Sequence, residues 1–323
     1  MNTPLSPKKR MRDAFLQTVL DGMDAQEDIF FLTADFGSPV LDVLQQRHPQ
    51  RFLNVGIAEQ NAINVAAGLA LEGFRVIVYA IAPFLTMRCL EQVRTNLALL
   101  SQVRAMNVTL AGVGAGFSYE VSGPTHQALE DLSLMRSIPG VGVWSPADAA
   151  TASGMAEAAL AQTGIRYVRL DSHPLPDLAP WNSADAARGF RVLESQGDAA
   201  LLATGYMTHV ALAVRDELAR RGVAVRVVDG WNLTDFDGAA LASALSGCRV
   251  ALTMEEGFLG AGGLDSLAQM ELSPRVPSVA FLHAGLPRRY RFEIGKRAAL
   301  LAAHGLSAEM LADRVETALK ANA

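Results

Sequence analysis

The sequence predicts an α/β protein with two doubly wound domains, and three observations support this fold class. Short apolar runs alternate with helical patterns along the 323 residues, as expected for consecutive βα units. The runs lack the polar alternation of half-exposed strands, so the sheets are expected to be parallel and covered on both faces. The 27 glycines and the aromatic content of 7% suit many tight strand-to-helix turns better than an all-β fold.

The first domain is predicted to span residues 1–180. Its strands are expected at residues 29–34, 75–80, 108–113, 141–145 and 166–170, and a further short strand is expected to end at Asn54. The helices between them are expected at residues 12–23, 60–71, 86–99, 127–137 and 148–161. Helices that separate successive strands predict a parallel sheet.

A proline-rich stretch without periodicity, residues 172–189, is interpreted as an interdomain linker. The alternation then restarts, which predicts a second α/β domain at residues 188–323. Its strands are expected at residues 199–204, 223–229, 249–254 and near 278–282, and its helices at residues 210–221, 238–245 and 307–320. Ser307 is expected to cap the last of these helices.

Composition excludes several classes of function. The net charge of −5 argues against nucleic-acid binding through phosphate contacts. The polar start of the chain does not resemble a signal peptide, and the apolar stretches are too short to span a membrane. The two cysteines form no disulfide framework and the six histidines show no metal-ligand spacing, so we expect a cytoplasmic chain without its own metal site.

Three segments could carry chemistry, and the first contains Glu59. This carboxylate lies where a strand is expected to end and a helix to begin, at the sheet edge where α/β proteins bind ligands. The helix that follows is rich in alanine and glycine, so another group can approach it closely. Taken alone, Glu59 is equally consistent with a capping residue on a tightly packed helix.

The second and third segments also follow predicted strands. Glycine-rich residues 112–117 precede residues 122–127, and a helix expected from Gln127 would offer its N-terminus to an anion or a substrate. His126 in this segment could act in acid–base chemistry, or could cap the helix in a rigid turn. In residues 82–88, the ring of Phe84 could stack on a planar ligand, or could belong to the core.

Together, these segments resemble the pyrimidine-binding domain of transketolases and deoxyxylulose-phosphate synthases. The resemblance runs from about Arg12 to Leu170 and is carried by TADFGSP, NVGIAEQNAINVAAGLA, PFLTMRCLEQVR and SGPTHQ. ALLATG, VRVVDGWNLTDFD and LTMEEG resemble the C-terminal domain of the same family more weakly. The second domain is accordingly expected to be a smaller transketolase C-terminal-like α/β domain.

The resemblance implies a cofactor, thiamine diphosphate, and roles for several residues. Glu59 would hydrogen-bond N1′ of the aminopyrimidine, which requires a partly protonated carboxyl whose pKa is raised by desolvation. Phe84 would stack on the pyrimidine, and His126 would face the reacting substrate and move protons at its oxygens. Asp35, near the thiazolium, Ile57 and Arg88 are also expected to contact the cofactor.

The resemblance also implies a partner. Single-chain transketolases begin with a further domain whose GDG motif and downstream asparagine hold Mg²⁺ and the diphosphate. This sequence has only Gly197-Asp198, without the second glycine. We therefore expect a split transketolase, in which an N-terminal subunit holds Mg²⁺ and the diphosphate and the assembly is α2β2. Without that subunit the chain is expected to be inactive.

Substrate recognition departs from the family pattern. The resemblance assigns Arg12, Ser122 and Arg169 to a sugar or sugar-phosphate substrate. However, Gly114 stands where a phosphate-binding histidine is expected, and Ser172 where an arginine is expected. These departures predict an unphosphorylated or unusual sugar.

Three alternatives remain open from the sequence. The chain could be the β subunit of a 2-oxoacid dehydrogenase, which shares this pair of domains and also works as half of an enzyme. A deoxyxylulose-phosphate synthase is less consistent, because that enzyme is normally one long chain. A non-catalytic regulatory subunit would not need Glu59, Phe84 and His126 together. Glu255 and Glu256 are interpreted as residues at a strand end, without a chemical role.

Overall fold

The first sheet has six parallel strands, in the order β3-β2-β4-β5-β7-β6. A computed structural model describes residues 9–322 of the chain. The strands of this sheet are β2 (Ile29–Thr33), β3 (Phe52–Asn54), β4 (Arg75–Ile81), β5 (Asn107–Val113), β6 (Val141–Trp144) and β7 (Gly164–Leu170). Every residue within β4 except its two ends is buried, which confirms strands covered on both faces.

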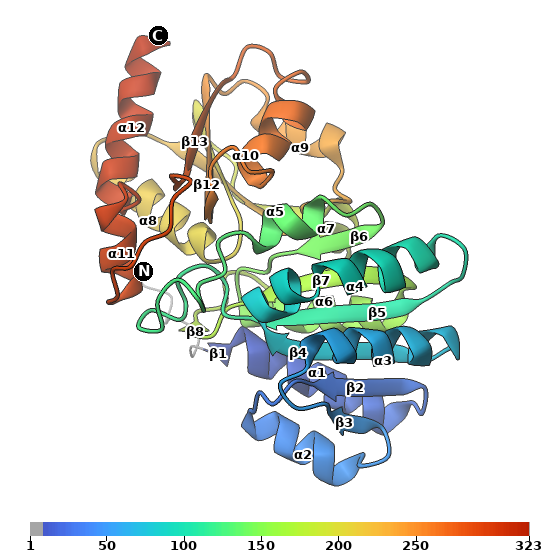
Figure 1. Cartoon of the computed structure of the whole chain (residues 1–323). Helices are drawn as coiled ribbons and strands as arrows, with labels where there is room; N and C mark the ends of the chain where they lie inside the picture. Colours follow the sequence, from blue (N-terminus) through green and yellow to red (C-terminus); the bar gives the residue numbers. More distant parts are fainter. Residues whose placement is uncertain (1–8, 323) are drawn as a thin grey trace.

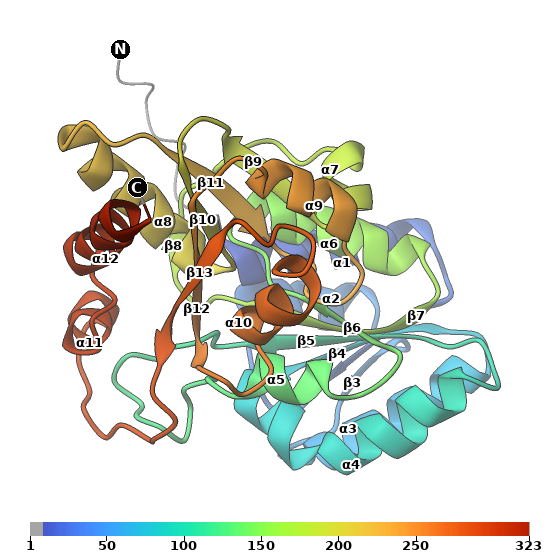
Figure 2. The ribbon, with the colours of Figure 1, turned by 90° about the horizontal axis from the view of Figure 1, so that it is seen from above.

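Helices cover both faces of this sheet, as the apolar runs predict (Figure 2). One face packs against α1 (Met11–Ala25), α2 (Pro39–Arg47) and α6 (Ala149–Ala161). The other packs against α3 (Glu59–Leu71), α5 (Asp131–Arg136) and a composite helix made of η1 (Phe84–Arg88), α4 (Leu90–Gln92) and η2 (Val93–Leu99). Because all six strands are parallel, their carboxyl ends and the loops that follow them lie at one edge.

The second sheet has five strands, in the order β13-β12-β10-β11-β9, and it lies above the first sheet in Figure 1. They are β9 (Phe190–Glu194), β10 (Ala199–Ala203), β11 (Val225–Gly230), β12 (Val250–Phe258) and β13 (Ala280–Leu286). Four of them are parallel, and β9 joins β11 antiparallel at one edge. The sequence did not predict β9, because its run is short and follows the proline-rich segment directly.

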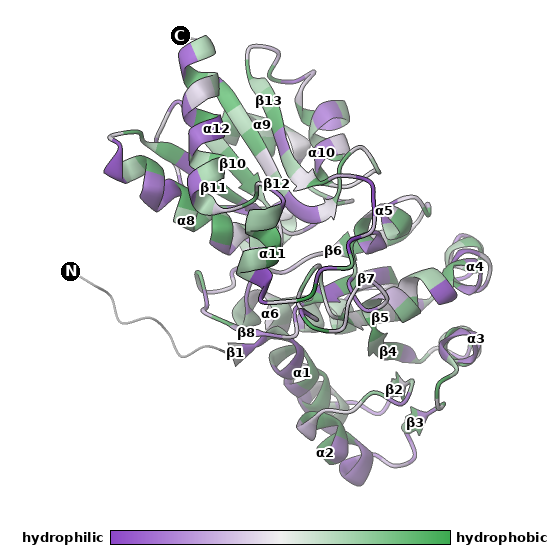
Figure 3. Cartoon of the chain, turned by 60° about the vertical axis from the view of Figure 1, so that its left-hand side comes forward, coloured by the Kyte–Doolittle hydropathy of each residue, from purple (hydrophilic) through white to green (hydrophobic). Residues whose placement is uncertain are grey.

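Two helical layers enclose the second sheet. One face packs against α8 (Tyr206–Arg220), α11 (Arg297–Ala303) and α12 (Ala308–Ala321). The other contacts α9 (Gly238–Leu245), α10 (Leu264–Leu267) and η3 (Ala268–Leu272), and its core is continuous with that of the first sheet. Figure 3 shows hydrophobic residues along β10 and β13 and both kinds of residue on α12. The predicted cap of α12 is present, because Ser307 Oγ accepts from Met310 N at 3.3 Å.

Three local predictions need correction. The helix expected from Gln127 begins only at Asp131, because the backbone of Ala128 exchanges hydrogen bonds with Gly116 instead of continuing a helix. Residues 86–99 are largely π-helical. The segment 172–189 is not without regular structure: it contains β8 (Pro174–Leu175), paired with β1 (Lys9–Arg10), and α7 (Ser183–Arg188), which Asn182 caps.

No helix within residues 9–322 is both long and apolar enough to cross a membrane. Both cysteines are free and buried.

Candidate functional site

Glu59 is the first residue of α3 and follows β3 after a short turn. Its side chain is only 3% exposed, and its carboxylate Oε2 accepts from Arg88 Nη1 at 2.5 Å. The start of α3 has no side-chain cap, because the residue at the cap position is Ala58. The Glu59 carboxylate bonds to Arg88 instead. Glu59 is therefore a buried carboxylate at the carboxyl edge of the sheet, and its ionic partner Arg88 is partly exposed.

Asn54 fixes the loop that leads to this carboxylate. Its side-chain Oδ1 accepts from the backbone nitrogen of Asp35 at 3.0 Å and from that of Gly56 at 2.9 Å. Asp35 has a φ of 50°, a conformation that no other non-glycine among the described residues adopts. Such a conformation is costly and must be held by its surroundings. The ends of β2 and β3 are thus tied together beside Glu59, and Ile57 projects from the loop with 78% exposure.

Arg88 links Glu59 to Phe84 and, through Phe84, to His126. Its Cζ lies 4.7 Å from the centre of the Phe84 ring, and the Phe84 and His126 ring centres are 5.2 Å apart at 71°. Phe84 and Arg88 are the two ends of η1, a π-helical turn of the kind often found at functional sites. Glu59, Arg88, Phe84 and His126 therefore form one continuous row, although they come from three separate strand ends.

His126 lies in a loop and not at a helix N-terminus. Its Nδ1 is 3.0 Å from Thr125 Oγ1, and its ring meets Tyr119 edge-on at 6.4 Å between ring centres. The loop is held by the Gly116–Ala128 backbone pair instead of by α5. The helix N-terminus that the sequence predicts at this position is therefore absent, because α5 begins only at Asp131.

Of the three residues assigned to the substrate, two share a cavity of about 360 Å³. Arg12 lines it with a half-buried side chain whose Nε lies 2.8 Å from Asp13 Oδ1. Ser122 lines the same cavity from the loop before His126. Both residues therefore line one cavity, whose wall also includes Tyr119, the residue whose ring meets that of His126.

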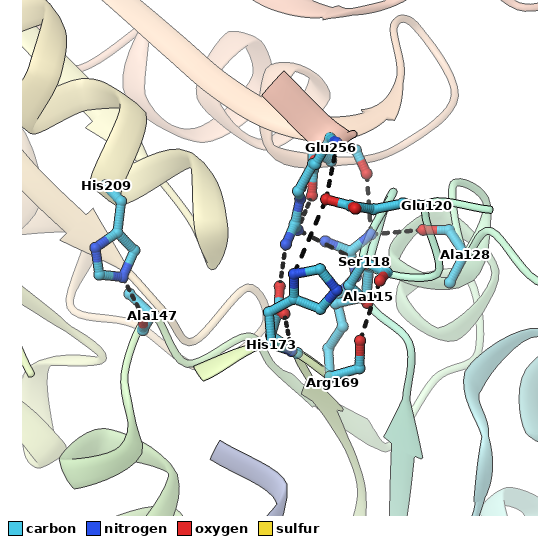
Figure 4. A network of polar contacts seen from close by, with 12 residues as sticks. Ala115, Ser118, Glu120, Ala128, Ala147, Arg169, His173, His209 and Glu256 are labelled. Atoms are coloured by element: carbon cyan, nitrogen blue, oxygen red, sulfur yellow. Dashed lines mark hydrogen bonds and ion pairs between the residues drawn. The ribbon is translucent and has the colours of Figure 1, made fainter. Parts of the chain in front are cut away.

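Arg169, the third of these residues, does not line that cavity, and its assignment to the substrate stays a prediction. The side chain is 2% exposed and its Nε lies 2.8 Å from Asp131 Oδ2. Its Nη2 donates to the carbonyl oxygens of Ala128 and Glu256 (Figure 4). Nε and Nη2 of Arg169 therefore join β7 to α5, to the loop before it and to β12 of the second sheet.

Arg169 is one part of a buried charged network that sequence reasoning missed. At its centre Arg297, 3% exposed, pairs with Asp171 at 2.5 Å and with Glu256, and packs 3.6 Å above the centre of the Tyr206 ring. Arg297 and Asp171 are 126 residues apart, and nothing in the local sequence links them. The interpretation of Glu256 as a strand-end residue omitted this role as an ionic partner.

Glu255 lies next to this network, and its ionisation makes the stability of the protein depend on pH. It is fully buried, its Oε2 accepts from Leu264 N at 2.7 Å, and burial raises the pKa of its carboxyl to about 7. Below the unfolded-state pKa of 4.5, the carboxyl is protonated in both states. Between 4.5 and about 7, the folded state keeps a proton that the unfolded state has lost, so this group makes stability fall as pH rises.

We therefore expect Glu255→Gln to reduce the loss of stability between pH 5 and pH 8, because the amide oxygen can still accept from Leu264 without ionising. The measurement is the urea midpoint of the wild type and the variant at both pH values. Glu271→Gln, at an exposed residue of η3, is the control and should leave the difference unchanged. An identical pH dependence in the wild type and Glu255→Gln would contradict the expectation.

Within residues 9–322, no group of three or more His, Cys, Asp or Glu side chains is arranged to hold a metal ion.

Comparisons with known proteins agree with the resemblance seen in the sequence. Residues 7–176 match the family model described as the transketolase pyrimidine binding domain, and residues 189–311 match that of the transketolase C-terminal domain. The chain is 31% identical to the 6-deoxy-6-sulfo-D-fructose transketolase subunit SqwH of Clostridium sp. (strain MSTE9), over 86% of each chain. It is 28% identical to one subunit of the apulose-4-phosphate transketolase of Actinobacillus succinogenes, over 94% of this chain and 95% of that one.

A solved structure described as a split gene transketolase, an inactive β4 tetramer, superposes with a TM-score of 0.83. It is 29% identical, and the match covers 98% of this chain and 100% of the other.

Proposed function

Since this chain belongs to the transketolase family, we propose that it is the pyrimidine-binding subunit of a split, thiamine-diphosphate-dependent transketolase. Such an enzyme transfers a two-carbon ketol unit from a ketose to an aldehyde acceptor. The observation that carries the proposal is the row formed by Glu59, Arg88, Phe84 and His126 at the carboxyl edge of the sheet. The match with separate transketolase subunits, over 86% of each chain for one and over 94% of this chain and 95% of the other for the second, supports the split form. These relatives do not favour the 2-oxoacid dehydrogenase or regulatory alternatives.

The residues of the row fit the aminopyrimidine part of the cofactor. Glu59 offers a buried carboxyl that could hydrogen-bond a ring nitrogen, and Phe84 offers an aromatic face beside it. In the structure the Arg88 guanidinium is paired with the Glu59 carboxylate. The Arg88 side chain is 43% exposed, so it has room to turn away when the pyrimidine binds. When bound, thiamine diphosphate would supply the carbanion-stabilising chemistry of the reaction.

The roles proposed for this chain's side chains follow from their positions. Glu59 would hold the pyrimidine tautomer through N1′, a task that needs a carboxyl shielded from water. His126, beside Phe84 and half-buried, would give and take protons at the substrate's oxygens. Asp35 and Ile57 would border the bound cofactor from the loops after β2 and β3. Arg12 and Ser122 would contact the substrate in the adjacent cavity.

The partner completes the proposal. An N-terminal transketolase subunit would hold Mg²⁺ and the diphosphate, in an α2β2 assembly in which neither chain is active alone. We also propose that the pyrimidine-binding domain comprises residues 1–180 and the C-terminal domain residues 188–323. Residues 1–8 of the first range lie outside those that the structure describes.

The test is to purify the chain alone and together with the product of the neighbouring gene, and to titrate each with thiamine diphosphate and Mg²⁺. We expect a circular dichroism band of bound cofactor, and a donor-dependent change in that band, only for the complex. A complex that forms without binding the cofactor would overturn the catalytic assignment. Turnover by the chain alone would overturn the split assignment.

A further inference from the structure

A second cavity, of about 600 Å³, lies at the opposite edge of the first sheet, where β6 and β7 begin. Its wall takes residues from the ranges 138–144 and 162–166 of the first sheet and from residues 233–238, which follow β11 of the second sheet. The two sheets meet here, because Trp144 of β6 forms a β-bridge with Asn232, and β6 is the strand of the first sheet nearest to the second (Figure 1). The cavity is therefore separate from the row of residues at the carboxyl edge.

Arg166 places a buried positive charge in the wall of this cavity. Four arginines of the described residues are buried, and three of them, Arg169, Arg191 and Arg297, each pair with a buried carboxylate. Arg166 is 4% exposed and forms no ion pair with a carboxylate in the same part of the chain. Burial lowers the pKa of its guanidinium to about 10, so it is still a cation at physiological pH. A buried charge without a counter-ion is costly, so an anion is the missing partner.

Neutral acceptors hold the Arg166 side chain in place. Its Nη1 donates to Asn107 Oδ1 at 2.8 Å and to the carbonyl oxygen of Ala159 at 2.9 Å, and its Nη2 donates to that of Gln162 at 2.9 Å. Its Cζ lies 5.4 Å from the centre of the Trp144 ring. These contacts fix the direction of the guanidinium but do not neutralise it, which prepares it to bind an anion that enters the cavity.

Two more arginines line the cavity. Arg136 is half-buried, and its Nε and Nη1 donate to backbone carbonyl oxygens at 2.9 and 2.7 Å, while its Nη2 has no hydrogen-bond partner among the described residues. Arg275 is exposed, with Nη2 3.9 Å from Glu271 Oε2. The carboxylates in the wall are those of Glu271 and Asp235, which are both exposed. Three guanidiniums against two carboxylates leave one net positive charge around the cavity.

The rest of the wall is largely apolar and includes two aromatic residues, Trp144 and Phe236. Gly142 keeps the space beside them open, because a Cβ at this position would lie 3.6 Å from Arg166 Cβ and 3.8 Å from Trp144 Nε1. The volume lies within the range of small-molecule sites, which combine an apolar wall with a few placed polar groups. The wall thus offers cations on one part of its surface and aromatic rings on another.

We propose that this cavity binds a nucleoside phosphate, with Arg166 and Arg136 at the phosphate and Trp144 and Phe236 beside the base. A guanidinium fork matches phosphate oxygens through parallel hydrogen bonds, and an aromatic wall matches a planar base. The inference goes beyond the proposed function and does not depend on it, because no residue of the row at the carboxyl edge lines this cavity.

The test is calorimetric titration of the full chain alone with ADP, adenosine and inorganic phosphate. ADP should bind at least about 10-fold more tightly than either of the others, because each of them offers only one part of the recognised chemistry. Gly142→Leu puts a side chain into the space beside Arg166 and should weaken ADP binding by at least about 100-fold. Gly68→Leu adds the same side chain to an exposed position of α3 and should bind ADP like the wild type.

A second variant decides the test if Gly142→Leu does not fold, which circular dichroism shows. Arg275→Gln changes an exposed side chain and should weaken ADP binding roughly 3- to 10-fold, the loss of one solvent-accessible hydrogen bond, with no effect on adenosine. Its control is Arg220→Gln, at an exposed arginine of α8. The inference is overturned if ADP does not bind, if adenosine or inorganic phosphate binds as tightly as ADP, or if the folded variants of the cavity bind ADP like the wild type.

Discussion

Glu59→Gln should lower kcat of the assembled enzyme by about 10²- to 10⁴-fold, the range that a positioned acid–base group contributes. Glutamine has nearly the same volume, and its amide oxygen can still accept from Arg88, so the packing at the start of α3 should be preserved. What is lost is a carboxyl that can share a proton with the pyrimidine. The measurement is steady-state turnover of the complex, with the circular dichroism band of the bound cofactor recorded in parallel.

A matched control is available close to the site. Glu91 is an exposed carboxylate in α4, and Glu91→Gln changes the same functional group without touching the row of site residues. It should retain wild-type turnover. If Glu59→Gln kept more than half of the activity while the control did too, the proposed role of Glu59 would have to be abandoned.

Arg297→Met should destabilise the protein by about 3–5 kcal/mol, because it leaves Asp171 and Glu256 as buried carboxylates without their cation. Methionine keeps most of the length of the side chain, so the cost comes from unpaired charge more than from a cavity. Urea denaturation at pH 7, followed by circular dichroism, measures the change. A loss below about 1 kcal/mol, the worth of a surface pair, would show that the network is not effectively buried.

Two further variants separate charge from packing. Arg221→Met removes a guanidinium that also pairs with several carboxylates, Glu217, Asp313 and Glu316, but at the surface, and little change is expected. Combining Arg297→Met with Asp171→Asn and Glu256→Gln removes both stranded charges. That triple variant should recover much of the lost stability, since replacing a whole buried ionic group is often close to neutral.

The sequence predicts the fold well where apolar periodicity decides it. The strands β2, β4 and β5 and the helices α3 and α9 lie within about two residues of their expected ranges. In each of them the spacing of apolar residues follows the repeat of the strand or helix. The helix expected from Gln127 failed because Ala128 bonds to Gly116, a partner brought near only by the folded loop. The helix propensity of the local sequence cannot predict such a long-range backbone pairing.

The candidate site could also be predicted only in part. Strand ends can be located from sequence, so Glu59, Phe84 and His126 were expected at one edge, and they do lie there. Which side chains meet across that edge cannot be read from strand order: the Arg88–Glu59 pair and the use of Arg169 by Asp131 depend on side-chain geometry. Arg297 had no signal in the sequence, because its partners Glu256 and Asp171 lie 41 and 126 residues away along the chain.

The short strand β3 has a consequence for a chain that we propose must meet a partner. It forms one edge of the six-stranded sheet with only three residues, Phe52–Asn54, before the chain turns away toward Glu59. An edge so short offers few free backbone groups on which a strand from another molecule could pair. The apolar interior strands are therefore shielded from edge-to-edge aggregation during the interval in which a newly made subunit has yet to find its complement.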